Sequence, residues 1–281
     1  MKAARFDYRR PASLPEALRL LQEGDGTAKA MAGGQSLGPM LNLRLARPAL
    51  VVDIARLPEL RGVTAEGGGV QVGGCVTHAE IEDGVFTALR GHPLQRAAGQ
   101  IAYRAVRNRG TLAGSLAHAD PAADWVVVMT ALGAELEIAS PRGRRRLPMT
   151  EFMIGAYTTV LGPDELITTV HLPALGPDAR WGYYKFCRKT GEFAEASCAA
   201  LFDPSTRTAR IALGALDGAP QLIAPLASEV ARDGPAAADH ERVAAAVAAA
   251  LPGKDAVDRR LHATAVTRCL AQAFAAEPVS A

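Results

Sequence analysis

The chain has 281 residues, of which 49% are hydrophobic and 21% are charged, and its formal net charge is +2. This composition predicts a soluble globular protein of one large domain or two ordinary ones. The net charge is too small to indicate a nucleic-acid partner. No apolar stretch has the length of a membrane span, and the first residues form no apolar signal segment, so we expect a cytoplasmic protein.

The cysteines do not form a metal-binding pattern. No two of them stand in a C-x-x-C motif, and we expect neither an iron–sulfur cluster nor a structural zinc on this chain. Reduced, buried thiols of a cytosolic protein are the favoured interpretation. The cysteines are Cys75, Cys187, Cys198 and Cys269.

The N-terminal part predicts alternating strands and short helices. Ser13 and Glu16 have the spacing of a capping box, Pro15 suits the first turn, and Gly24 ends the predicted helix. The further predicted elements are an extended segment at 6–8, strands at 28–32 and 50–54, a helix at 37–45, a hairpin at 63–76, a helix from Thr77 or His78, and a helix at 93–108 ended by Gly110.

Two stretches rich in small residues interrupt these elements. The first glycine stretch is Ala32-Gly33-Gly34-Gln35-Ser36, and the second glycine stretch is Thr111-Leu112-Ala113-Gly114-Ser115. A backbone without bulky side chains can bring its N–H groups close to an anion, and a hydroxyl adds a donor. Two such stretches together suit a ligand with two phosphates. Neither matches the P-loop or the G-x-G-x-x-G fingerprint, and each alone is also ordinary turn chemistry.

The C-terminal half predicts a second domain after a break at Pro173–Asp178. The whole chain is therefore expected to be α+β, with a mixed domain at 1–175 and a sheet covered by helices at 176–281. After the second glycine stretch, the first domain is predicted to continue with a helix at 125–132 and strands at 134–139, 144–147 and 166–172. The second domain is predicted to have strands at 181–188, 196–202 and 208–216 and a helical tail at 225–277 broken by Gly234-Pro235 and Pro252-Gly253.

With both glycine stretches in place, the sequence resembles the medium, FAD-binding subunit of the molybdenum hydroxylases, which include xanthine and carbon monoxide dehydrogenases. The resemblance covers essentially the whole chain. The second stretch departs from the family pattern at Ala113, where relatives usually have a glycine. The matching segments are Phe6-x-Tyr8-x-x-Pro11, Ala32 to Leu37, Asn42-Leu43-Arg44, Val52-Asp53-Ile54, Thr111 to Leu116, Ala119-Asp120-Pro121-Ala122-Ala123-Asp124, and Lys185 with Arg188 and Gly191.

The resemblance implies a two-part FAD-binding domain of the PCMH type at 1–175. It implies a C-terminal domain at 176–281 with a three-stranded antiparallel sheet and helices. The two glycine stretches would hold the FAD pyrophosphate, Asp124 would hydrogen-bond FAD, and Lys185 would face the flavin or its polar edge. The cofactor-binding residues implied are Ala32, Gly33, Gly34, Gln35, Ser36, Ile101, Ala102, Thr111, Ala113, Gly114, Ser115, Asp124, Leu166, Ile167, Lys185 and Phe193, the last a candidate for stacking on the ring.

The resemblance also implies partners. A large subunit would carry molybdopterin, a small subunit would carry [2Fe-2S] clusters, and the assembly would be a dimer of heterotrimers. FAD on this chain would pass electrons from the clusters to an external acceptor. No residue of this chain needs to act as a general acid or base, and a bound metal is not expected.

Alternative functions remain open at the level of the sequence. Gly34-Gln35-Ser36-Leu37-Gly38 fits the G-x-S-x-G elbow of an α/β-hydrolase, with Ser36 as nucleophile, Asp124 as acid and His171 as base. Only one short strand precedes Ser36, which argues against an elbow. His118, Asp120 and Asp124 could form a metal cluster, although acidic residues equally suit a helix N-terminus. A flavin-binding scaffold without catalytic turnover is a third possibility.

Overall fold

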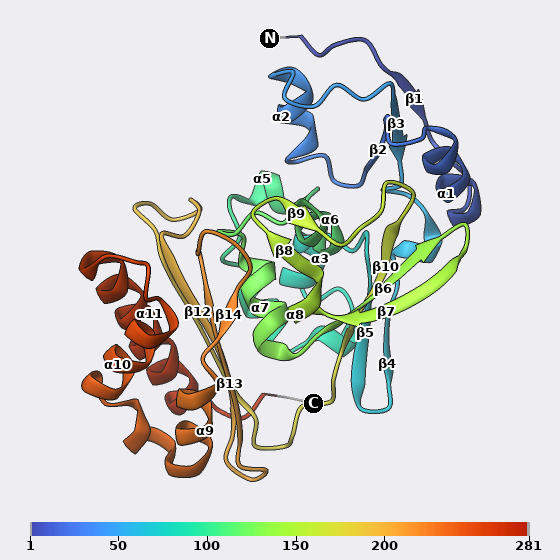
Figure 1. The fold of residues 1–281 in the computed structure, drawn as a ribbon. Helices are drawn as coiled ribbons and strands as arrows, with labels where there is room; N and C mark the ends of the chain where they lie inside the picture. The colour runs from blue at the N-terminus through green and yellow to red at the C-terminus, as the bar shows by residue number, and fades with distance from the viewer. Residues whose placement is uncertain (1, 280–281) are drawn as a thin grey trace.

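The computed structural model describes residues 2–279, so Met1 and Ser280–Ala281, the outermost residues of the two expected domains, lie outside the description. Three main sheets follow one another along the chain, each with its own helices, and a small two-stranded ribbon adds a fourth (Figure 1). Within the described residues, none of the helices combines the length and the apolar character needed to cross a membrane.

The first sheet is parallel and has the strand order β1-β3-β2. Its core joins the apolar face of α1 to Val52, Ile54 and Leu57. The expected strands and helices of this region are all present, within a few residues of their predicted bounds. They are β1 (Asp7–Arg9), α1 (Leu14–Glu23), β2 (Ala28–Met31), α2 (Leu37–Asn42) and β3 (Leu50–Asp53), with a short 3-10 turn at η1 (Pro58–Leu60).

Helix α1 begins at the predicted cap, but the capping box is incomplete. The Ser13 side chain accepts a hydrogen bond from the backbone N–H of Glu16, whose own carboxylate accepts from Ala12 instead of Ser13. The cap and the apolar spacing therefore set the start of the helix, as the sequence indicates. Gly24 is its C-cap.

The second sheet is antiparallel, with the order β4-β5-β10-β6-β7. Two hairpins, β4–β5 and β6–β7, flank the central strand β10, which follows them in the sequence. The hairpin predicted at 63–76 and the strands predicted at 134–139 and 144–147 are confirmed. The strands are β4 (Val63–Glu66), β5 (Gly69–Gly73), β6 (Glu135–Ser140), β7 (Gly143–Pro148) and β10 (Leu166–Leu172), and a separate small ribbon pairs β8 (Met153–Gly155) with β9 (Thr158–Thr159).

The prediction of one helix at 93–108 is wrong. The segment forms two short helices, because Gly99 caps the first and Ala102 adopts a left-handed conformation with φ 40°. The buried side chain of Ile101 continues the apolar pattern through the break.

The helices of this region are α3 (His78–Glu82), α4 (Pro93–Ala98), α5 (Arg104–Arg107), α6 (Leu112–His118), α7 (Asp124–Leu132) and α8 (Met149–Phe152), with a 3-10 turn at η2 (Thr87–Leu89).

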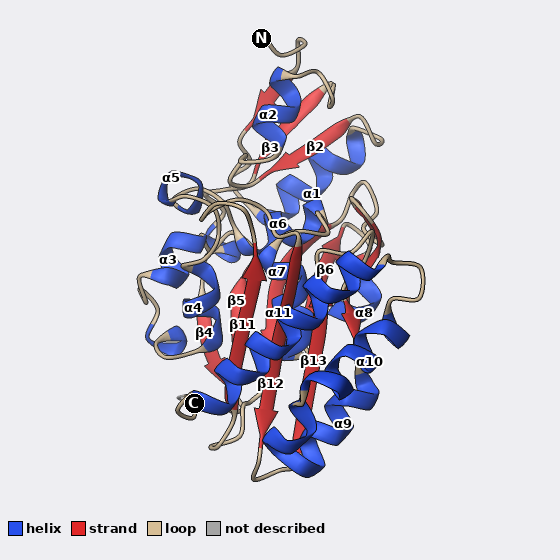
Figure 2. Cartoon of the chain, turned by 90° about the vertical axis from the view of Figure 1, so that its left-hand side faces the viewer, coloured by secondary structure: helices blue, strands red, loops and turns tan. Residues whose placement is uncertain are grey.

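The third sheet is antiparallel with the order β11-β12-β13-β14. It holds the three long strands that were expected, and a fourth strand of two residues extends its edge, so the three-stranded description is corrected to four. Helices α9, α10 and α11 cover one face (Figure 2). The elements are β11 (Arg180–Phe186), β12 (Ala196–Asp203), β13 (Thr208–Gly214), β14 (Gln221–Leu222), α9 (Ala224–Asp233), η3 (Gly234–Ala238), α10 (His240–Ala250) and α11 (Ala256–Ala275).

Helix α7 packs against the other face of this third sheet. All nine of its residues are buried, from Asp124 to Leu132, so it lacks a solvent-facing side. Its side chains share one core cluster with strands of the second sheet and with Trp181, Tyr183 and Ala199 of the third. Helix α7 therefore connects the two predicted domains through a common core.

Candidate functional site

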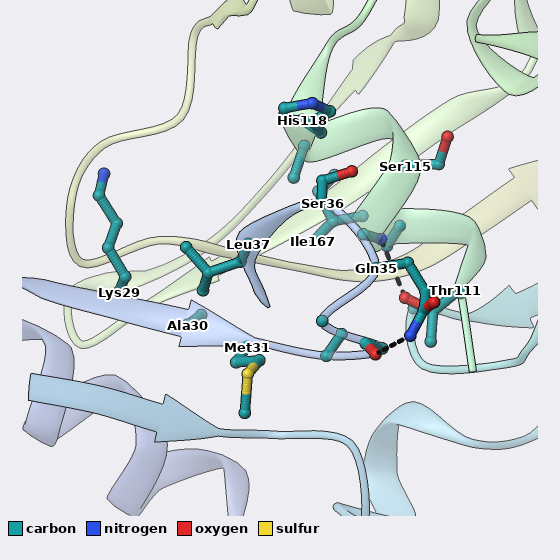
Figure 3. A pocket seen from close by; sticks show the side chains of 18 of the residues that line it. Lys29, Ala30, Met31, Gln35, Ser36, Leu37, Thr111, Ser115, His118 and Ile167 are labelled. Atoms are coloured by element: carbon teal, nitrogen blue, oxygen red, sulfur yellow. Dashed lines mark hydrogen bonds between the residues drawn. The ribbon is translucent and has the colours of Figure 1, made fainter. Parts of the chain in front are cut away.

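A cleft of about 700 Å³ lies where the first sheet meets the helices of the second. Strand β2, the segment after it, helix α6 and the start of β10 line this cleft (Figure 3). Its size is within the range of cofactor sites. Every residue that the sequence analysis assigned to cofactor binding lines it except Lys185.

The first glycine stretch, Ala32–Ser36, carries unpaired main-chain donors. Between residues 2 and 279, the backbone N–H groups of Gly33, Gly34, Gln35 and Ser36 find no acceptor. Gly34 has a backbone φ of 71°, a conformation that residues with a side chain rarely adopt. Consecutive N–H groups without acceptors at the wall of a cleft are the chemistry of an anion-binding nest.

The two glycine stretches are pressed together at their backbones. A Cβ atom on Gly33 would lie 2.0 Å from the carbonyl oxygen of Arg109, just before the second stretch. The side chain of Gln35 lies beside Thr111 (Figure 3). Only a glycine at position 33 allows the two backbones to lie this close. The two glycine stretches therefore converge, as the sequence suggested.

The second glycine stretch does not interrupt the predicted elements as the sequence suggested, because most of it is helical. Residues from Leu112 onward form the first turn of α6, and the Thr111 side chain caps this turn by accepting from the N–H of Gly114 at 3.2 Å. The N–H groups of Leu112, Ala113 and Ser115 donate to backbone carbonyls. This stretch therefore offers the hydroxyl groups of Thr111 and Ser115 to the cleft, and its amides are already used.

The alanine that departs from the family pattern is accommodated by packing. Ala113 is 7% exposed, and a Cβ atom placed on Gly74 would lie 3.0 Å from its methyl group. The methyl group of Ala113 is thus directed toward the end of β5. The glycine at position 74 leaves the room that this methyl group needs.

The predicted flavin contacts lie together in the cleft and are mostly apolar. Ile101, Leu166 and Ile167 are buried, and Phe193 is 65% exposed. Ala102 lies in the break between α4 and α5. The arrangement offers buried aliphatic contacts and one exposed aromatic ring that a planar ligand can cover.

Asp124 begins α7 and is the buried carboxylate of the cleft. Its Oδ1 atom accepts from the hydroxyl of Tyr183 at 2.6 Å and from Nζ of Lys185 at 2.8 Å. The Lys185 ammonium also donates to the carbonyl oxygen of Gln100. Lys185 therefore acts on the cleft through Asp124, and it is not itself a lining residue. Burial and the Asp124 charge raise the pKa of Tyr183 well above its usual value, so its hydroxyl stays protonated.

Sequence reasoning missed a buried histidine that lines the cleft. Nδ1 of His78 accepts from the indole Nε1–H of Trp125 at 3.0 Å, which leaves the ring proton on Nε2. Burial, aided by the charge of Arg107, lowers the pKa of His78 to about 3, so the ring is neutral at physiological pH. Its place after the capping residue Thr77 is the only signal in the sequence.

The structure does not assemble the alternative sites. Ser36 and Asp124 line the cleft, whereas His171 lies on β10 outside it, with its Nε2 atom 3.6 Å from Glu137. The hydrolase triad is therefore not formed. Among the described residues, no group of three or more histidine, cysteine, aspartate or glutamate side chains is arranged to hold a metal ion.

Comparison with known proteins agrees with the cleft. Residues 4–175 match the family model described as the FAD binding domain in molybdopterin dehydrogenase. The chain is 39% identical over 212 residues to the carbon monoxide dehydrogenase medium chain of Hydrogenophaga pseudoflava, covering 74% of each chain. It is 40% identical over 222 residues to the nicotine 6-hydroxylase medium subunit of Paenarthrobacter nicotinovorans, covering 78% of this chain and 77% of the relative.

A solved structure shows the same likeness over the full length. The chain aligns with quinoline 2-oxidoreductase from Pseudomonas putida 86 with a TM-score of 0.86 and 33% sequence identity. The alignment covers 98% of this chain and 98% of that chain. The similarity therefore extends beyond the segment matched by the family model into the third sheet and its helices.

Proposed function

This chain belongs to the family of FAD-binding domains of molybdopterin dehydrogenases, and we propose that it passes electrons from partner iron–sulfur clusters through FAD to an external acceptor. It is the FAD-containing subunit of a multisubunit molybdenum oxidoreductase. The observation that carries the proposal is the row of unpaired N–H groups at Gly33–Ser36, in a segment that lines the cleft together with Asp124.

The residues of the cleft fit FAD in kind. The pyrophosphate would be held by the backbone of the first glycine stretch and by the hydroxyls of Thr111 and Ser115. The ring would contact Ile101, Ala102, Leu166 and Ile167 and stack against Phe193, while Asp124, fixed by Lys185, would accept a hydrogen bond.

Bound FAD supplies electron storage, since it takes up electrons singly and releases them in pairs. The chain's own residues bind the cofactor, orient it and exclude water from it. The Lys185 ammonium, 2.8 Å from Asp124, balances the charge of that carboxylate, so the acid repels an anionic cofactor less. No residue of the chain needs to transfer a proton in this scheme.

The proposal includes the assembly. We expect a large subunit with molybdopterin, a small subunit with [2Fe-2S] clusters and a dimer of such heterotrimers. The relatives are named medium chains or medium subunits, which supports a multisubunit complex. The proposed division of this chain remains 1–175 for FAD binding and 176–281 for the C-terminal domain.

The first test is a visible absorption spectrum of the purified chain, with the extracted cofactor identified by its mass. Stoichiometric FAD is the expected result. A protein that is colourless but takes up added FAD would still support binding, with retention helped by the partners. A folded chain that cannot be reconstituted with FAD would overturn the proposal.

Electron transfer needs a second measurement on the copurified complex. Substoichiometric dithionite should bleach the flavin absorption of the complex faster than that of the isolated FAD-loaded chain, because dithionite reduces flavin directly in both and the clusters add a route only in the complex. The same complex with the flavin removed should reduce an added acceptor more slowly. Bound FAD that cannot be reduced through the partners would instead indicate a scaffold subunit.

A further inference from the structure

The carboxylate of Asp124 is held asymmetrically. Both of its donors, the Tyr183 hydroxyl and the Lys185 ammonium, bind the same oxygen, Oδ1. Among residues 2–279, Oδ2 accepts no hydrogen bond, although Asp124 is only 8% exposed and lines the cleft. Oδ2 keeps access to the cleft, so a ligand bound there can reach it and donate a hydrogen bond to it.

The two donors come from the same strand and differ in rigidity. Tyr183 and Lys185 stand on one face of β11, with Tyr184 on the opposite face. The Tyr183 side chain is buried and has two rotatable bonds, whereas lysine has a flexible four-carbon stem. Tyrosine therefore fixes the carboxylate rotation, and lysine compensates its charge.

We propose that Tyr183 is a positioning residue for cofactor binding: it holds Oδ1 of Asp124 so that Oδ2 accepts a hydrogen bond from an N–H or O–H group of FAD. This inference rests on the proposed function and extends it to a residue outside the cleft. Tyr183 does not contact the cofactor itself, and it acts on the cofactor through Asp124.

A simple packing role for Tyr183 predicts something different. If the ring only filled the core, removing its hydroxyl would change the FAD dissociation constant by the same factor whether or not position 124 carries a carboxylate. If it acts through Asp124, removing the hydroxyl should have no further effect once Oδ2 has been replaced. The coupling between the two positions therefore separates the two roles.

The experiment uses the full-length chain after removal of FAD, and it measures the FAD dissociation constant by flavin fluorescence. The Tyr183→Phe variant is expected to bind FAD at least about tenfold more weakly, equivalent to about 1.4 kcal/mol. Tyr184→Phe is the matched control, because its hydroxyl contacts Arg268 on the helical side of the sheet. The control should bind FAD like the wild type.

Asp124→Asn provides the second variant, because its amide preserves the shape of the side chain and places an N–H₂ group where Oδ2 stands. It should weaken FAD binding even if Tyr183→Phe does not fold. The double variant should bind FAD no more weakly than Asp124→Asn alone.

Two results for the Tyr183 and Asp124 variants would overturn the inference, and a third would come from the control. One is wild-type affinity in Tyr183→Phe, and the other is full additivity of the two substitutions. Failure of the wild-type chain to bind FAD would instead refute the proposed function, so the two ideas fail in different ways. An equal loss in Tyr184→Phe would show a general effect of the sheet and would also refute the positioning role.

Discussion

The indole of Trp125 and the imidazole of His78 form a buried pair, joined by a hydrogen bond of 3.0 Å between Nε1 and Nδ1. The pair links the second residue of α7 to the first residue of α3. Because the ring is buried and His78 accepts through Nδ1, the structure favours the neutral imidazole. This relationship makes folding sensitive to pH.

The His78→Gln variant should reduce the loss of stability on acidification. The folded-state pKa of about 3 lies below the usual unfolded value of about 6.5, so the unfolded chain binds more protons between these values. Stability therefore falls as the pH drops from 7 toward 3. Glutamine can still accept from Trp125 but does not titrate. Between pH 7 and 5 the variant should lose about 2 kcal/mol less than wild type in urea unfolding.

The exposed His240 offers the control for this measurement. His240→Gln should show the wild-type dependence on pH. Burial also lowers the pKa of His92 to about 4, so His92 contributes a further loss of stability on acidification. This contribution is present in both variants. An unchanged pH dependence in His78→Gln would contradict the prediction.

Gly33→Ala should abolish tight FAD binding. The new methyl group would meet the Arg109 carbonyl oxygen at 2.0 Å, and backbone cannot move aside as a side chain can. The first glycine stretch must then shift away from the second. Gly38→Ala is the matched control, because a Cβ atom there has no neighbour within 4 Å and lies in α2. The control should retain FAD and gain up to about 1 kcal/mol of stability. FAD content by absorption and unfolding by heat report both effects.

Thr111→Ala should weaken both α6 and cofactor binding. The substitution removes the side-chain oxygen that accepts from Gly114, at a cost of about 1 kcal/mol, and it removes a hydroxyl from the cleft. Thr111→Ser keeps both groups and should behave like the wild type in thermal unfolding and in FAD titration. If the alanine variant matches the serine variant in both measurements, the assignment of this cap is wrong.

The four thiols should differ in reactivity in the folded chain. Cys75, Cys198 and Cys269 are buried, whereas Cys187 is half-buried. Burial raises the pKa of Cys75 to about 12, which suppresses its reactive thiolate. Reaction with a maleimide at pH 8 should label Cys187 first and the others only after unfolding in urea. Rapid labelling of Cys75 would contradict the packing of the first sheet.

Local signals predicted most of the secondary structure. The cap at Ser13, the hairpin glycines and the alternation of β10 each act within a few residues, so they are readable without the fold. The break at 99–103 was missed because Ile101 continues the helical apolar pattern although it lies in a turn. The residue with the left-handed conformation in this break is Ala102 and not a glycine, so the sequence does not indicate that conformation.

The candidate site was predicted by resemblance, and its geometry was not. The sequence indicated that both glycine stretches approach one ligand, yet Thr111 turned out to be a helix cap, which depends on a side-chain hydrogen bond. The roles of His78 and Tyr183 depend on contacts 47 and 59 residues away in the sequence. Such contacts leave no local pattern, so only the structure could reveal them.

The complete burial of α7 has a consequence for how the molecule unfolds. The helix is enclosed by residues on both sides of position 175, including Trp181 and Tyr183. A fragment ending at that position would expose apolar side chains of α7 to water and should aggregate. The intact chain should then melt as one cooperative unit, and the flavin cleft, which ends at the first turn of this helix, should be lost in the same transition.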